Sequence, residues 1–88
     1  TKYGGITNFI NIYKKNKKKI KYITPHYLGS GPGLFASAHL VSGISNVPLE
    51  FDVTENRIRD TIFKKNLKIK NGNLILNNKP GIGIKLKF

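Results

Sequence analysis

Hydrophobic and polar positions follow three different patterns in the first half of the chain. Apolar residues recur at helical spacing from 9 to 13, which predicts a helix that ends within a run of lysines. Residues 20–24 alternate and are rich in β-branched and aromatic side chains, so we expect a strand that stops at the proline after them. Residues 34–43 are almost all small or apolar, which predicts a helix buried on several sides.

The second half is predicted to contain short β segments. Residues 47–51 are a second strand candidate, and a polar stretch follows at residues 55–60. The Asn71-Gly72 pair between two alternating runs is a strong hairpin signal, because both residues tolerate the positive φ angles of a two-residue turn. The hairpin strands and a last alternating segment are expected at residues 67–70, 74–76 and 82–88.

The order of these elements indicates an α/β fold. A helix, a strand, a helix and a strand precede an antiparallel tail, and this alternation favours a parallel sheet joined by helical crossovers. Two strands do not complete such a sheet, and 88 residues make at most one small domain. The sequence also contains no methionine. We therefore expect the chain to be a piece of a longer protein.

Basic residues give the chain a net charge of +12, a common sign of a nucleic-acid or anionic-membrane partner. Most of them are lysine, however, whereas arginine is the side chain favoured for bidentate phosphate and guanine contacts. The abundance of Lys, Asn and Ile indicates codon bias in an AT-rich genome. The densest run, residues 14–21, falls where a surface helix would end, a position that favours cations. We interpret it as a solvated helix face.

Several classes of protein are disfavoured by what the sequence lacks. Without cysteine there are no disulfides or thiolate metal sites, and a reducing compartment is permitted. No apolar stretch approaches the roughly 18 residues of a membrane span. No long apolar segment typical of a signal peptide follows the first basic residue. These features predict a cytoplasmic protein without a membrane partner.

The chemically informative residues surround the predicted strand ends. His26 follows the first strand and leads into a loop with three glycines, and Glu50 ends the second strand. In parallel α/β folds, the carboxyl ends of the strands are where chemistry takes place. The glycines, with Gly31 at their centre, either bind an anion at a helix N-terminus or make a tight turn. His39 lies within an apolar helix and is interpreted as a packed residue. Three acidic residues fit no coordination motif and are interpreted as surface or salt-bridging groups: Asp52, Glu55 and Asp60.

A series of motifs occurs in register along nearly all 88 residues. In chain order they are Gly4-Gly5-Ile6-Thr7 opening a helix, Pro25-His26 ending a strand, Ala36-Ser37-Ala38-His39-Leu40 within a helix, Leu49-Glu50 after it, and Asn71-Gly72 with Pro80-Gly81-Ile82-Gly83. The series resembles the C-terminal part of the enolase superfamily, specifically the mandelate racemase subgroup, which includes many acid-sugar dehydratases. The Gly31-Pro32-Gly33 run is most similar to the dehydratase-like members.

The resemblance implies a modified (β/α)₈ barrel of the TIM type with an N-terminal α+β capping domain. Residues 1–63 would form the C-terminal segment of the barrel, with residues 20–24 as the seventh strand and residues 47–50 as the eighth. Residues 64–88 would form a short antiparallel β tail that returns toward the capping domain.

The resemblance also implies roles for His26 and Glu50. His26 matches a histidine that acts as a general base or acid and is held by an aspartate from the sixth strand. Glu50 matches a glutamate across the active site that hydrogen-bonds a carboxylate oxygen of an enediolate intermediate. The aspartate, the three carboxylate ligands for Mg²⁺ and the basic residues of the second strand would lie outside this chain. A substrate contact at Gly31 is a further expectation.

These implications predict part of a Mg²⁺-dependent enzyme that removes the proton next to the carboxylate of an acid sugar or hydroxy acid. Imidazole suits this task because it exchanges protons near neutral pH. Dehydration is favoured over racemisation. The full-length parent is expected to be a homo-oligomer, and the fragment is expected to be inactive alone.

Three alternatives stay open. The muconate cycloisomerase and dipeptide epimerase branch is disfavoured because its members use lysine bases. A small basic nucleic-acid-binding module would need aromatic residues interleaved with basic ones on one face, whereas Phe9, Tyr13 and Tyr22 are interpreted as core residues. The third alternative is a structural or assembly role, because the apolar helix at residues 34–43 would be exposed in isolation and could drive association.

Overall fold

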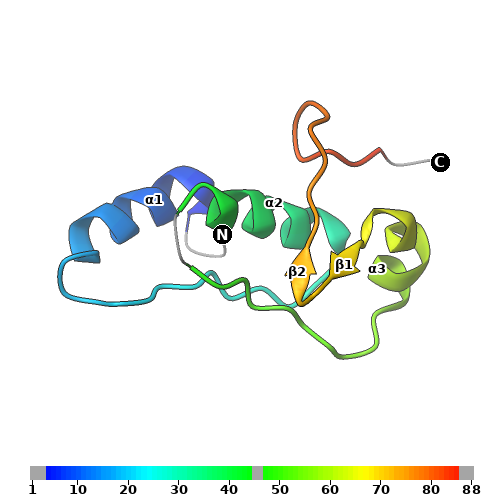
Figure 1. Cartoon of the computed structure of the whole chain (residues 1–88), viewed down its shortest axis with the longest axis horizontal. Helices are drawn as coiled ribbons and strands as arrows, with labels where there is room; N and C mark the ends of the chain where they lie inside the picture. Colours follow the sequence, from blue (N-terminus) through cyan, green and yellow to red (C-terminus); the bar gives the residue numbers. More distant parts are fainter. Residues whose placement is uncertain (1–3, 45–46, 86–88) are drawn as a thin grey trace.

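The computed structural model describes residues 4–44 and 47–85, and its elements surround one central helix (Figure 1). α2 lies at the centre, with α1 packed against one of its ends and α3 against the other (Figure 1). The end of the segment predicted at residues 82–88 lies outside the described residues. The bounds of the elements are α1 (Gly5–Asn16), α2 (Gly31–Ser42), α3 (Arg57–Ile62), a 3-10 turn (Lys64–Asn66), β1 (Ile69–Lys70) and β2 (Asn73–Leu74).

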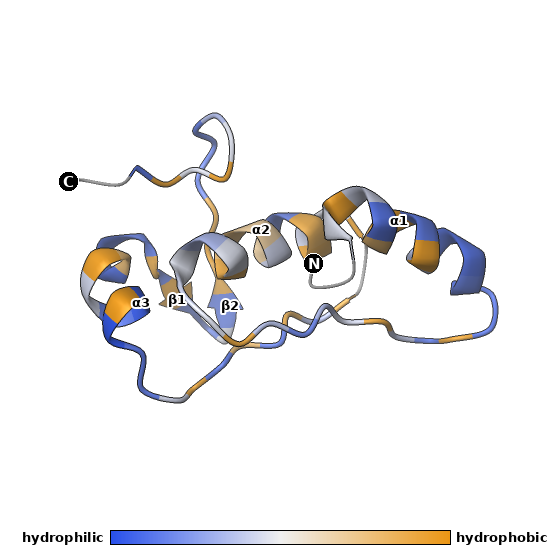
Figure 2. Ribbon diagram, turned by 180° about the vertical axis from the view of Figure 1, so that it is seen from behind, coloured by the Kyte–Doolittle hydropathy of each residue, from blue (hydrophilic) through white to orange (hydrophobic). Residues whose placement is uncertain are grey.

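The helix predicted from the apolar spacing at residues 9–13 is confirmed as α1. It begins at Gly5 because Gly4 adopts a φ of 83°, a left-handed conformation that glycine takes without strain. It ends at Asn16, within the lysine run, as expected. Figure 2 shows this end of α1 and the residues after it as a hydrophilic region. The lysines of residues 14–21 are all exposed, in agreement with a solvated face.

The aromatic residues near this lysine run are divided between core and surface. Phe9 is buried with Leu40 and Ile44, and Tyr13 packs partly against them. The interpretation of Tyr22 as a core residue is wrong, because 55% of it is exposed. Lys21 Nζ lies 5.3 Å from the centre of the Tyr22 ring, within the range of a cation–π contact.

α2 is buried by other elements of the same chain, so the expectation that residues 34–43 would be exposed in isolation is wrong. Leu34, Phe35, Leu40 and Val41 are all buried. α1 and α3 cover its two ends, and the segment at residues 47–51 and the hairpin line a pocket along its side. The apolar composition of α2 is therefore explained by packing within the chain.

The strands predicted at residues 20–24 and 47–51 do not form hydrogen-bonded strands. Both segments are extended and run in the same direction alongside α2, which connects them in sequence and runs the opposite way (Figure 1). Within residues 4–44 and 47–85, no backbone hydrogen bond joins the two segments. A strand requires such a partner, and Pro25 and Pro48 each remove one backbone donor.

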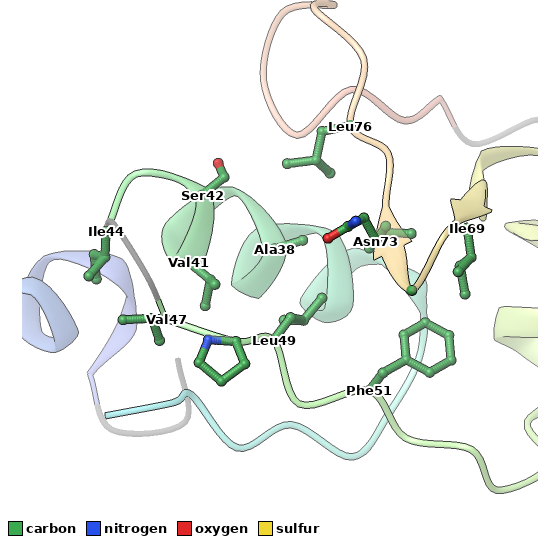
Figure 3. Close-up of a pocket in the computed structure, with 13 residues that line it drawn as sticks. Ala38, Val41, Ser42, Ile44, Val47, Leu49, Phe51, Ile69, Asn73 and Leu76 are labelled. Atoms are coloured by element: carbon green, nitrogen blue, oxygen red, sulfur yellow. The ribbon is translucent and has the colours of Figure 1, made fainter. Parts of the chain in front are cut away.

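The side chains of both extended segments nevertheless alternate as they do in β-strands. Ile23, Pro25 and Tyr27 are partly or fully buried, whereas Thr24 and His26 between them are exposed. Residues 47, 49 and 51 are likewise half-buried, and Pro48 and Glu50 are exposed. Figure 3 shows Val47, Leu49 and Phe51 in the pocket beside α2. His26 and Glu50 therefore lie on the face turned away from α2.

The hairpin predicted around Asn71-Gly72 is confirmed. β1 and β2 pair antiparallel, with Ile69 opposite Leu74. Asn71 and Gly72 have φ angles of 52° and 75°, the left-handed conformations that a tight two-residue turn requires. Residues 82–85 form no strand, so that part of the last predicted β segment is wrong.

A pocket of about 600 Å³ lies between α2, the segment at residues 47–51 and the hairpin (Figure 3). Its lining is mostly aliphatic, including Val41, Ile44, Leu49 and Leu76, and it contains no titratable side chain. The pocket therefore offers no group for acid–base chemistry. Within the described part of the chain, no helix has the length and apolar character needed to cross a membrane.

Candidate active site

His26 lies at the end of the first extended segment, where its neighbours fix the main chain. Pro25 is among the most completely buried residues, and Tyr27 is half-buried. In contrast, 54% of the His26 side chain is exposed. The alternation of this segment therefore presents the imidazole to solvent on an anchored backbone.

Glu50 comes from the end of the second extended segment and contacts His26 directly. Its Oε1 atom lies 2.6 Å from His26 Nδ1, a short separation typical of a charge-assisted hydrogen bond. Because a carboxylate only accepts hydrogen bonds, Nδ1 carries the proton at this contact and Nε2 is left for another partner. Because 42% of the Glu50 side chain is exposed, the contact holds the imidazole in a fixed orientation at an open surface.

The direct contact differs from the expected position of Glu50 across an active site from His26. The distribution of acidic residues explains the difference, because the chain has only four and two of them, Asp52 and Asp60, bind Arg59. Glu50 is the carboxylate within reach of the imidazole. The structure brings both candidate residues together, and their catalytic roles stay predictions.

The three glycines of the loop after His26 are required by two aromatic rings. A Cβ atom on Gly33 would lie 2.0 Å from Cζ of Tyr27, and one on Gly29 would lie 2.7 Å from the Tyr27 hydroxyl oxygen. A Cβ atom on Gly31 would lie 2.2 Å from Cγ of Phe63. None of the three glycines has a positive φ angle. The space taken by the rings, and not an unusual backbone conformation, therefore explains these glycines.

Gly31 opens α2 and is buried against Phe63, itself only 2% exposed. This packing is a sufficient reason for glycine at the position. The substrate contact expected at Gly31 stays a prediction, and it would have to share the site with the Phe63 ring.

Arg59 organises the loop that follows Glu50. It is 5% exposed and donates hydrogen bonds of 2.7 Å each to the main-chain oxygens of Asp52 and Thr54. It also binds the Asp60 carboxylate through Nε at 2.7 Å. The hydrogen bond with Asp60 raises the pKa of Arg59 above its ordinary value. The salt-bridging role expected for Asp52 and Asp60 is confirmed, and Glu55 is exposed.

The two carboxylates of this loop predict a loss of stability in acid. The Arg59 side chain and then the Asn56 N–H hold the pKa of Asp60 below its ordinary value. The hydroxyl and N–H of Thr54, helped by Arg59, do the same for Asp52. A lowered pKa stabilises the fold fully above the unfolded-state value of about 3.9, and this contribution is lost as the pH falls through the lowered pKa. We expect the thermal midpoint of the chain to fall below about pH 4 and to fall less in Asp60→Asn. An equal fall in both proteins would contradict the role of Asp60.

The helix α3 and its cap were missed by the sequence analysis, which left residues 55–60 as a polar stretch. Asn56 caps the helix, because its Oδ1 accepts from the N–H of Arg59 at 2.9 Å. Asp60 in turn accepts from the N–H of Asn56 at 3.0 Å. A capping residue followed by an acid one turn later is a recognisable signal of a helix start. Asn56 also donates from Nδ2 to the main-chain oxygen of Gly29 at 3.2 Å.

The residues present do not form a magnesium site. Among the described residues, no group of three or more His, Cys, Asp or Glu side chains could hold a metal ion. Glu50 is engaged by His26, and Asp52 and Asp60 are engaged by Arg59. This donor set does not fit a hard divalent cation, which takes several oxygen ligands.

His39 has the structural role that its apolar surroundings predict. It is part-buried in α2, and its Nε2 lies 3.2 Å from the main-chain oxygen of Ile82. Because a carbonyl oxygen only accepts, His39 donates this hydrogen bond and ties the C-terminal tail to the helix. The interpretation of His39 as a packed residue is confirmed.

Comparison with known proteins gives one family and one curated relative. A family model described as enolase C-terminal domain-like matches residues 1–88. Arabinonate dehydratase of Saccharolobus solfataricus is 30% identical over 84 residues, which cover 96% of this chain and 22% of that protein. The chain therefore spans less than a quarter of the length of this relative. No solved structure matches the chain.

Proposed function

The chain belongs to the enolase C-terminal domain-like family, and on this basis we propose that it is the C-terminal barrel segment of an acid-sugar dehydratase. Residues 1–63 would supply the seventh and eighth strands of a (β/α)₈ barrel, and residues 64–88 would return toward a capping domain. The contact between His26 and Glu50 at the ends of two parallel segments carries the proposal.

The geometry around α2 supports a position within a barrel. Two extended segments run in the same direction and are connected through α2, the arrangement of a β-α-β unit (Figure 1). In a (β/α)₈ barrel, side chains that face away from the helices point into the barrel, and chemistry takes place at the carboxyl ends of the strands. His26 and Glu50 meet both conditions. A barrel would also supply neighbouring strands. The two extended segments could form with them the backbone hydrogen bonds that they do not form with each other.

In the proposed reaction, His26 exchanges protons through Nε2. In this chain Glu50 holds Nδ1 and so fixes the orientation of the ring, the task that the resemblance assigns to an aspartate of the sixth strand. Nε2 takes the proton from the carbon next to the substrate carboxylate, and the C–H electron pair forms the enediolate. The resulting imidazolium then gives a proton to the β-hydroxyl, which leaves as water, and the enol product becomes a 2-keto-3-deoxy acid.

The proposed class of substrate is taken from the relative, which is named arabinonate dehydratase. We extend this to an acid-sugar substrate for the present protein. We further propose that Mg²⁺ is held by residues outside this chain, where it would supply charge stabilisation for the enediolate.

The test uses the full-length protein in D₂O with Mg²⁺ and a panel of aldonates that differ in stereochemistry. We expect the α-proton of at least one aldonate to exchange with solvent while a 2-keto-3-deoxy acid accumulates, both followed by NMR. Exchange without loss of water would favour a racemase of the same family. If neither α-proton exchange nor a 2-keto-3-deoxy acid appeared with any acid sugar or hydroxy acid, the proposed function would be wrong.

A further inference from the structure

Two loops extend from the candidate catalytic residues, and one side chain joins them. The first loop contains residues 27–30 after His26, and the second contains residues 51–56 after Glu50. Asn56, at the end of the second loop, donates from Nδ2 to the main-chain oxygen of Gly29 in the first. The bond spans 27 positions of sequence and does not belong to any helix or hairpin.

The two ends of the Asn56 amide have different tasks. Oδ1 caps α3 by accepting from the N–H of Arg59 at 2.9 Å. Nδ2 reaches Gly29 at 3.2 Å. The cap orients the amide group, because α3 fixes Oδ1, and this directs Nδ2 toward the first loop. The capping function can therefore be kept by residues that lose the bond to Gly29.

On the second loop, Asn56 is connected back to Glu50 through Arg59. The Arg59 guanidinium donates to the main-chain oxygen of Asp52, two residues after Glu50, at 2.7 Å. Arg59 is buried, and the α3 backbone that carries it is capped by Asn56. The main chain on the Glu50 side is thus anchored to α3.

On the first loop, Gly29 is connected back to His26 through Tyr27. The Tyr27 ring lies so close to Gly29 and Gly33 that neither position has room for a Cβ atom. Of the two residues between His26 and Gly29, Tyr27 is therefore held by packing, whereas Leu28 is exposed. The contact between His26 and Glu50 closes a ring of interactions in which the Asn56–Gly29 bond is the opposite link.

We propose that Asn56 is a positioning residue of the candidate active site. Its bond to Gly29 holds the His26 and Glu50 loops at the separation that the 2.6 Å contact requires. The inference rests on the proposed function only for its kinetic consequence, since the geometric consequence at His26 is independent of the substrate. Loss of the bond to Gly29 lets the two loops separate, and the imidazole loses its fixed orientation.

Two variants of the full-length protein isolate this bond. Asn56→Ser keeps a good helix cap with a side chain too short for Gly29, and Asn56→Asp keeps the shape and the cap but has no N–H donor. Ile62→Gly is the matched control, because it weakens α3 at an exposed position and leaves Asn56 unchanged. With an acid-sugar substrate, we expect kcat to fall about tenfold to a hundredfold in both Asn56 variants with KM unchanged, and to stay near the wild-type value in Ile62→Gly.

The second readout is the tautomeric state of His26 in protein labelled with ¹⁵N-histidine. We expect the ring ¹⁵N shifts of His26 to report a single Nδ1–H tautomer in the wild type and in Ile62→Gly, and a mixture of tautomers in both Asn56 variants. Unchanged ring shifts in the Asn56 variants would overturn the positioning role, whatever the substrate of the enzyme. An equal fall in kcat in Ile62→Gly would also overturn it. A wild-type protein without acid-sugar activity would count against the proposed function alone, because the NMR comparison would still be valid.

Discussion

Replacement of His26 by asparagine is expected to lower the rate of α-proton exchange by about a thousandfold in the full-length protein. General acid–base groups contribute about 10²–10⁴-fold to a rate, and His26 is proposed to act in two proton transfers of the same reaction. Asparagine can still donate a hydrogen bond to Glu50, so the loop geometry is kept while the proton acceptor is lost. The measurement is the single-turnover exchange rate of the aldonate α-proton in D₂O.

His39→Asn is the matched control for this experiment, because it makes the same change at the other histidine. His39 donates to the main-chain oxygen of Ile82 and has no proposed part in the reaction. We expect near-normal exchange in His39→Asn, with a small loss of thermal stability. Equal exchange rates in His26→Asn and the wild type would remove His26 from the mechanism. Glu50→Gln then tests the orienting contact, because an amide can no longer act as an anionic acceptor for Nδ1.

Replacement of Gly31 by alanine is expected to lower the free energy of unfolding of the chain by about 3 kcal/mol. The added methyl group would be placed 2.2 Å from Cγ of Phe63, and this ring is buried, with only 2% of it exposed. Overpacking of this kind typically costs about 1–3 kcal/mol and occasionally more. Urea unfolding followed by circular dichroism measures the change.

Gly43→Ala provides the control at the other end of α2. The nearest atoms to a Cβ at Gly43 are 3.5 Å away, which is ordinary contact, and the φ angle of −80° suits alanine. We expect Gly43→Ala to change the free energy of unfolding by no more than about 0.5 kcal/mol or to increase this free energy slightly. Phe63→Ala should reduce the additional effect of Gly31→Ala, because it removes the colliding ring. Additive losses in the double variant would show that the collision is not the cause.

The sequence predicted the parts of the fold that depend on local signals. The helical spacing around Phe9 and the apolar run that contains Leu40 correspond to α1 and α2. The Asn71-Gly72 turn forms because both residues accept left-handed angles. His26 and Glu50 were identified from their positions at the ends of alternating segments, and the structure brings them into contact.

The remaining features depend on contacts between distant residues. The segment at residues 20–24 has the alternation of a strand, but a strand also needs hydrogen-bonding neighbours, which composition does not reveal. The contact of Glu50 with His26 joins residues 24 positions apart, and Arg59 binds two of the other three carboxylates, Asp52 and Asp60. The glycines around Gly31 were interpreted as a possible anion site or turn, because the rings that exclude a side chain come partly from Phe63, 32 positions further along the chain.

The close approach of Gly31 and Phe63 has a consequence for sequence variation in this family. The two positions share one fixed volume, so a larger residue at 31 should be found only with a smaller one at 63. The same exchange should link Gly33 with Tyr27, whose ring occupies the space of a Cβ there. Such paired changes would report on packing alone. A glycine-rich stretch at this place in a related protein would then carry no information about ligands until the residues paired with it are known.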